Sequence, residues 1–108
     1  MQISEQILSM KDDCVKIRRD LHRIPEIGFD LQKTHEYIKP IIEACRPDEL
    51  KVLAEVGFKA VFYAKDADRT IAFRADMDGM KNTEENKCRF RSRNKGVMHA
   101  VSYTHLRA

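Results

Sequence analysis

The apolar residues of this chain change their spacing once, near residue 50, and that change limits the folds open to it. Before this point, apolar side chains recur every three or four residues, the spacing that places them on one face of a helix. After it, they gather in short segments rich in β-branched and aromatic residues, which favour strands. The sequence therefore predicts helices first and strands second.

Two helices are predicted in the first half. The first has Ser4 as its N-cap and Pro25 as its far limit, and we expect its apolar stripe to pack against a core. The second covers residues 31–45, where Pro40 predicts a kink or an interruption. The stripe of the first helix consists of Ile3, Ile7, Met10, Cys14, Ile17 and Leu21.

Three short strands are predicted after the helices, at residues 50–56, 60–64 and 70–75. The polar link at residues 65–69 suits a hairpin between the second and third strands. Residues 79–95 are polar and have no clear period, so a loop is expected there. The predicted class is α/β, with two helices followed by three short strands.

Composition sets further limits. With 108 residues the chain has room for one small domain, and 43% hydrophobic residues suffice for a core and argue against disorder. No apolar run approaches the ~18 residues that cross a bilayer, so no membrane partner is expected. Cys14, Cys45 and Cys88 lack C-x-x-C spacing, which indicates free thiols in a reducing compartment. Since no export signal is visible at the N-terminus, a cytoplasmic location is expected.

The segment at residues 71–78 carries two carboxylates at the end of the third predicted strand. Residues two apart in an extended chain point to the same side, so Arg74, Asp76 and Asp78 share one face. Ligands and metals collect at the carboxyl ends of strands in α/β sheets, and carboxylates there bind a cation or orient a metal-bound histidine. An Asp-rich turn chosen for backbone reasons is the alternative, and spacing alone favours the turn.

Three motifs in one order change that weighting: HRIPEIGF at residues 22–29, TIAFRADMD at 70–78 and GVMHA at 96–100. Together they resemble the metal-dependent amidohydrolase branch of the aminoacylase and carboxypeptidase-type metallopeptidases. That branch includes hippurate hydrolases, N-acyl-amino-acid amidohydrolases and N-acetyldiaminopimelate deacetylases. The resemblance covers about residues 10–100.

The resemblance implies a hydrolase that cleaves the amide bonds of N-acyl amino acids or small peptides with two divalent metal ions, zinc or manganese. It implies an α/β/α sandwich catalytic domain and a smaller domain through which the parent protein forms a homodimer. Asp78 matches the family aspartate that follows the strand and steadies the metal site. Asp76 stands where many relatives carry a ligand histidine, whereas this branch has aspartate. Asp76 and Asp78 are the predicted catalytic residues.

The sequence departs from the family after GVMHA. The branch continues with Cys-Gly-His-Asp, but Val101 stands here in place of the ligand cysteine and Tyr103 in place of the ligand histidine. Neither side chain replaces an N or S donor for zinc. We therefore expect residues 1–100 to be an incomplete N-terminal part of the catalytic domain and residues 101–108 to be an artefactual tail foreign to the family. No metal ligand, no bound cofactor and no activity are predicted for the chain alone. His22 is expected to pack at the end of the first helix, and His35 is expected to be a half-buried structural residue. His99 resembles the family's motif histidine but is not expected to bind a metal without its family neighbours.

The C-terminal half also carries a basic stretch. Residues 51–108 hold twelve Lys and Arg against seven Asp and Glu, and several of the cations alternate along residues 87–95. An extended cationic edge contacts phosphates, so a small basic α+β nucleic-acid-binding module using these residues is the alternative function. Phe90 is the one aromatic residue there, too little for a stacking platform. A solvated loop in front of an active site is favoured, with no nucleic-acid partner.

Overall fold

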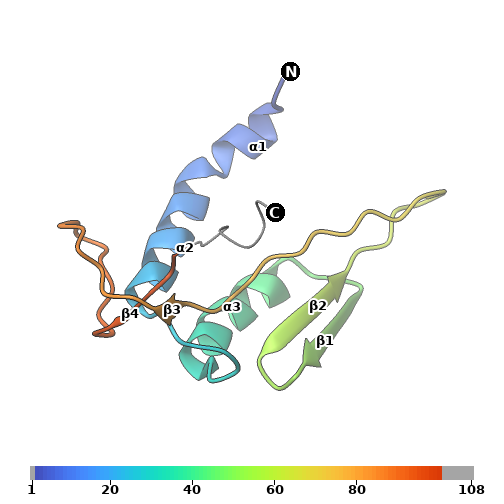
Figure 1. Cartoon of the computed structure of the whole chain (residues 1–108). Coiled ribbons are helices and arrows are strands. Elements are labelled where there is room, and N and C mark those ends of the chain that lie inside the picture. The colour runs from blue at the N-terminus through green and yellow to red at the C-terminus, as the bar shows by residue number, and fades with distance from the viewer. Residues whose placement is uncertain (1, 101–108) are drawn as a thin grey trace, which may run out of the picture.

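The computed structural model describes residues 2–100 and shows a mixed α/β chain, so the predicted class is confirmed. Three helices come first, and two small antiparallel sheets of two strands each follow them (Figure 1). The helices are α1 (Glu5–Ser9), α2 (Lys11–Arg23) and α3 (Gln32–Ala44), and the strands are β1 (Glu49–Leu53), β2 (Gly57–Val61), β3 (Met80–Lys81) and β4 (Val97–Met98).

The first predicted helix is divided into α1 and α2. Ser4 is the N-cap as predicted, and its hydroxyl oxygen accepts a hydrogen bond from the Ile7 amide at 3.4 Å. The break falls at Met10, whose amide bonds to the carbonyl three residues back rather than four. Just before it, the Ser9 hydroxyl donates to the Gln6 carbonyl at 2.7 Å. A hydroxyl that bonds the backbone within a helix competes with the helical pattern, which explains the break.

The expected packing of the first apolar stripe is wrong for its N-terminal half. No residue of α1 or α2 is buried among the described residues, and Ile7 and Met10 are 62% and 55% exposed. Further along, Ile17 and Leu21 are half-buried. Figure 1 shows α1 extending away from the other elements, so only the second half of the stripe reaches a packing partner.

Helix α3 runs through Pro40 without the predicted interruption. Pro40 is exposed, so water can satisfy the carbonyl that loses its amide donor. The helix is joined to the β1–β2 hairpin by His35, whose Nδ1 donates to the Val56 carbonyl at 2.9 Å. The His35 ring also stacks on Phe58 with centroids 4.4 Å apart. His35 is half-buried, which confirms the structural role expected for it.

The predicted hairpin between the second and third strands is wrong. The hairpin instead joins β1 to β2, with Leu53 opposite Gly57 across the turn. Residues 62–78 carry no strand assignment, and Figure 1 shows them leaving β2, turning at the far right and running back to β3. Ile71 and Phe73 are 79% and 95% exposed. A strand pattern forms a ladder only when one face is buried against neighbours, and the described chain offers none here.

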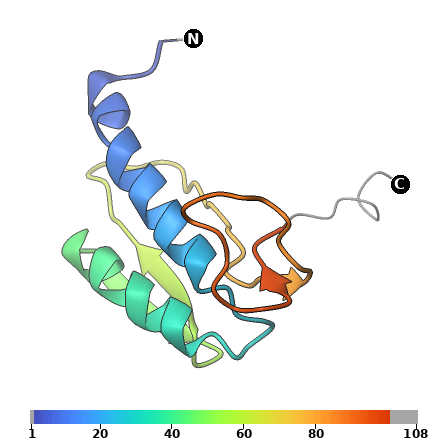
Figure 2. The same cartoon turned by 90° about the vertical axis from the view of Figure 1, so that its left-hand side faces the viewer.

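The second sheet joins two short segments that are far apart in the sequence. Met80 pairs with Met98 and Lys81 with Val97, and the Asn82 amide continues the contact by donating to the Gly96 carbonyl at 3.0 Å. The residues between the strands form the loop that was predicted, although β3 lies inside its expected range. Figure 2 shows this loop arching beside α2.

The buried residues that the structure describes are few, and most of them lie around the start of α3. Leu31 and Val56 are the buried hydrophobic residues that the structure describes, while Pro25 and Thr34 are the largest side chains that are fully enclosed. No described helix has the length and apolar character that a membrane crossing requires.

Candidate active site

The two predicted catalytic carboxylates lie together at the end of the extended segment that precedes β3. Both Asp76 and Asp78 are exposed to solvent. Asp76 forms a salt bridge with Arg74, with Oδ1 and Nη2 2.7 Å apart. Residues 74 and 76 therefore share a side of the chain, as their spacing predicts, although the segment is not a strand.

Gly79 is the point where the three sequence motifs meet. Its amide donates to the Glu26 carbonyl at 2.6 Å, and it forms a parallel bridge with Ile27. A Cβ at this position would lie 2.9 Å from the Met98 carbonyl oxygen and 3.1 Å from Cβ of Pro25. Only a residue without a side chain allows this approach. Gly79 thus holds Asp78 beside the segments that contain Pro25 and Met98.

Glu26 fixes the connector between α2 and α3 to the start of α3. Its carboxylate accepts hydrogen bonds from the Lys33 amide at 3.2 Å, the Thr34 amide at 2.7 Å and the Thr34 hydroxyl at 2.8 Å. These amides belong to the first turn of the helix, where donors have no partner inside the helix. Glu26 therefore replaces the N-cap side chain that Leu31 does not supply.

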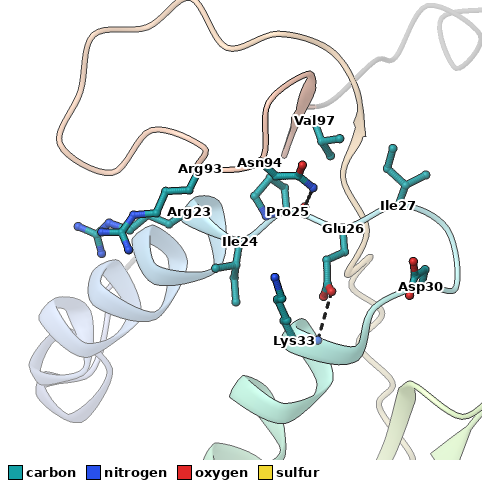
Figure 3. A pocket seen from close by; sticks show the side chains of 10 residues that line it. All are labelled: Arg23, Ile24, Pro25, Glu26, Ile27, Asp30, Lys33, Arg93, Asn94 and Val97. Carbon is teal, nitrogen blue, oxygen red and sulfur yellow. Dashed lines mark hydrogen bonds between the residues drawn. The ribbon is translucent and has the colours of Figure 1, made fainter.

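A cavity of about 410 Å³ lies between this connector and the loop before β4. Figure 3 shows the Glu26 side chain reaching toward the backbone of Lys33, while the side chains of Arg23 and Arg93 point away together on the other side. The Asn94 side-chain amide, which also lines the cavity, donates to the Pro25 carbonyl at 2.9 Å. The cavity is thus framed by the contacts that fasten the first motif to the third.

Glu84 is a buried carboxylate that sequence reasoning missed. It is 6% exposed, and its two oxygens lie 3.0 and 3.1 Å from Nε2 of His22. The Ser92 amide donates to the same carboxylate at 2.6 Å. The hydrogen bond from Ser92, followed by that from His22, lowers the pKa of Glu84 and outweighs the opposing effect of burial. No periodic pattern marks this residue, because it lies in a polar loop.

His22 and His99 come from opposite ends of the chain and face one another, with ring centroids 5.9 Å apart. His22 is held by Glu84, which fits the packing role expected for it. His99 is half-buried, and burial, followed by the charge of His22, lowers its pKa, while the Met77 backbone and Asp78 act in the opposite direction. His99 is therefore neutral at pH 7.

The described residues do not fit a pair of metal ions on their own. No group of three or more His, Cys, Asp or Glu side chains within residues 2–100 is arranged to hold a metal. Asp78 lies near enough to His99 to influence its pKa, but the two side chains would provide only two donors where a zinc site commonly uses three or four. Val101 and Tyr103, which stand at the positions of the family's ligand cysteine and histidine, lie outside the described residues.

The basic stretch at residues 87–95 does not form the extended cationic edge that the alternative function requires. It contains turns and bends, and two of its cationic residues make internal contacts. The Arg91 guanidinium donates to the Glu84 carbonyl at 3.1 Å, and the Arg93 amide donates to the Arg23 carbonyl at 2.9 Å. The stretch is the loop that was favoured, fastened to the end of α2.

Comparison with known proteins identifies the class to which these motifs point. The chain is similar to curated proteins that carry the name of one member of the branch that the three motifs resemble, which confirms that resemblance. No protein-family model and no solved structure matches it.

The particular relatives are N-acetyldiaminopimelate deacetylases. The protein of this name from Halalkalibacterium halodurans is 38% identical over 95 residues, which cover 87% of this chain and 26% of the relative. Those from Priestia megaterium and Bacillus cytotoxicus are 36% and 41% identical over 94 and 90 residues, covering 86% and 82% of this chain and 25% and 24% of the relatives. The chain thus spans about a quarter of the length of these curated relatives. None of the three names supports the alternative of a nucleic-acid-binding module.

Proposed function

We propose that this sequence belongs to an amidohydrolase that removes the acetyl group from an N-acetylated amino acid, with an N-acetylated diamino acid as the first substrate to test. The observation that carries the proposal is the meeting of the three family motifs at Gly79, where Pro25 and Met98 both lie within close approach. Similarity to proteins named N-acetyldiaminopimelate deacetylase supports the choice of substrate.

Within that protein, we assign this chain the role of positioning the acidic side of the active site. Gly79 anchors the segment that ends in Asp76 and Asp78, and both carboxylates are open to solvent rather than used in packing. The resemblance adds two divalent metal ions, zinc or manganese, to the whole protein. Because the described residues do not hold such a pair, most of its ligands must come from other parts of the protein. The resemblance also implies that the whole protein forms a homodimer.

A chimera tests the proposal. The segment of the Halalkalibacterium halodurans deacetylase that matches this chain is replaced by residues up to Ala100 of this sequence, and the rest of that relative is kept. The chimera is expected to release acetate from N-acetyldiaminopimelate in the presence of zinc or manganese, because the substituted motifs supply the same anchor and carboxylates. A chimera that folds like the unaltered deacetylase but releases no acetate would refute the proposal.

A second chimera contains the whole sequence, so that residues 101–108 also replace the corresponding residues of the relative. The rest of the relative is kept. It is expected to be inactive, because Val101 and Tyr103 replace the cysteine and histidine of the branch. Activity equal to that of the first chimera would show that these two positions are not ligands.

A further inference from the structure

A cavity of about 480 Å³ lies between α2 and the loop that joins β3 to β4. Arg18, Arg19 and His22 line it from the helix, and Lys87 and Phe90 line it from the loop. Figure 2 shows the loop and the helix side by side at this place. Asp76 and Asp78 are not among the residues that line the cavity.

The charges around this cavity are mostly positive. Arg18, Arg19 and Lys87 carry three cations, and none of them forms a salt bridge with a described residue. The one carboxylate in the lining, that of Glu84, is already engaged by His22 and the Ser92 amide. Cations that face a concave site with no free counter-charge attract an anion from solution.

A buried nitrogen of a residue that lines the cavity has no partner in the part of the chain that the structure describes. Nε2 of His99 is enclosed and forms no hydrogen bond with a described residue. Buried polar atoms in folded proteins nearly always have a partner, and an exception points to a missing group. His99 is itself among the residues that line the cavity.

The lining also has an apolar part. Phe90 lies beneath the Arg19 guanidinium, with the Cζ atom 4.7 Å from the ring centroid, and it meets the His22 ring edge-on with centroids 6.0 Å apart. Met98 adds a thioether beside it. An arginine held over an aromatic ring keeps its edge free to bind an oxyanion.

From these features we propose that this cavity binds a small oxyanion that carries an apolar group, with Arg18, Arg19 and Lys87 facing the anionic end and Phe90 and Met98 facing the apolar end. The shared chemistry is that of carboxylates and phosphate monoesters. The proposal does not depend on the deacetylase reaction.

The test is a titration of the full 108-residue chain followed by nuclear magnetic resonance. Benzoate and phenyl phosphate are the probes, and acetate and inorganic phosphate lack the apolar group. We expect saturable shifts of the amides of residues 84–90 and of the His99 ring nitrogens with at least one aromatic probe. If benzoate alone saturates, the ligand is a carboxylate, and if phenyl phosphate alone does so, it is a phosphate monoester. If neither saturates in the folded chain, the proposal is wrong.

Variants separate a built site from general attraction to a basic protein. Arg18→Gln/Arg19→Gln is expected to weaken binding about tenfold, since two charged hydrogen-bond donors are removed. Lys51→Gln/Lys59→Gln removes the same charge from the β1–β2 hairpin and is expected to leave the affinity within about twofold. Equal losses in the two double variants would overturn the proposal.

A single substitution on the loop gives an independent measurement of the affinity for the anion. Lys87 is exposed and makes no hydrogen bond or salt bridge with a described residue, so Lys87→Gln should keep the fold, which circular dichroism verifies. We expect binding about threefold weaker than in the wild type, because one of three cations is lost. Unchanged affinity in Lys87→Gln and in a folded Arg18→Gln/Arg19→Gln would place the anion elsewhere.

Discussion

Nε2 of His22 lies 3.0 Å from a carboxylate oxygen of Glu84, a residue 62 positions later in the chain. The side chains of the pair are 17% and 3% exposed. Glu84 also accepts the Ser92 amide, so one carboxylate joins the end of α2 to both sides of the loop before β4. This contact fixes the position of the segment that leads to His99.

Glu84 should make the stability of the chain depend on pH in the acid range. Its pKa is lowered from an ordinary value of about 4.5, so the carboxylate binds fewer protons when folded than when unfolded. Its contribution is therefore complete above about pH 4.5 and is lost as the pH falls through the lower folded value. Thermal unfolding followed by circular dichroism should show Glu84→Gln less stable than the wild type at pH 7, with the difference shrinking below about pH 4.5.

Glu85→Gln is the matched control for that experiment. Glu85 is exposed and makes no described hydrogen bond, so its replacement should leave the pH dependence unchanged. A difference between Glu84→Gln and the wild type that stays constant with pH would show that the Glu84 carboxylate is not held as described.

Glu26→Ala should weaken the junction between α2 and α3. The change removes three hydrogen bonds to Lys33 and Thr34, and Thr34 is only 1% exposed. We expect a loss of about 1–2 kcal/mol in the free energy of unfolding, the range for a removed helix cap. Urea denaturation measures it, with Glu43→Ala on the exposed face of α3 as a control that should stay within about 0.5 kcal/mol.

Gly79→Ala should disturb the meeting point of the three motifs. The new methyl group would lie 2.9 Å from the Met98 carbonyl oxygen, which belongs to the backbone and cannot turn away. We expect a loss of about 1–3 kcal/mol, typical of overpacking. Gly28→Ala meets no atom within 4 Å but has a φ of +62°, so it should lose about 1 kcal/mol from backbone strain alone. A neutral Gly79→Ala would contradict the close approach of Pro25 and Met98.

Asp76→Asn and Asp78→Asn should affect activity far more than stability. Both residues are exposed, so each change should alter the free energy of unfolding by less than about 0.5 kcal/mol. In the active chimera, Asp78→Asn should lower acetate release roughly 10- to 100-fold, as is typical of a residue that orients a catalytic ligand. Full activity of a stable Asp78→Asn chimera would remove Asp78 from the site.

Much of the local structure could be predicted from single residues. Ser4 begins the first helix and Pro25 lies just beyond the end of α2. Both effects are local, because a cap bonds amides of the next turn and the proline ring restricts the backbone near itself. The prediction of the third strand was wrong because a strand depends on residues that are distant in the sequence. Its alternating pattern at Ile71 and Phe73 is correct for a strand, but a strand also needs a neighbour to bond to and a face to bury. The described chain supplies neither.

The candidate site was predicted only in part. The spacing of Asp76 and Asp78 and the motif order identified the acidic segment, because two-residue periodicity is a local property. Glu84 and Ser92 gave no such signal. From the sequence, a carboxylate in a polar loop is expected to be exposed to solvent. Only the folded chain shows that Glu84 lies beside His22.

By itself, the sequence determined the helical first half, the approximate positions of β1 and β2 and the order of the three motifs, since each depends on residues close along the chain. The bounds of the second strand were wrong, because 60–64 was predicted where β2 covers Gly57–Val61. Only the tertiary structure decided that Pro25, Gly79 and Met98 meet, that Glu84 is buried against His22, and that a cavity surrounded by cations opens beside Phe90. Such contacts join residues tens of positions apart, and they arise when packing and hydrogen bonding of the whole chain outweigh local preference.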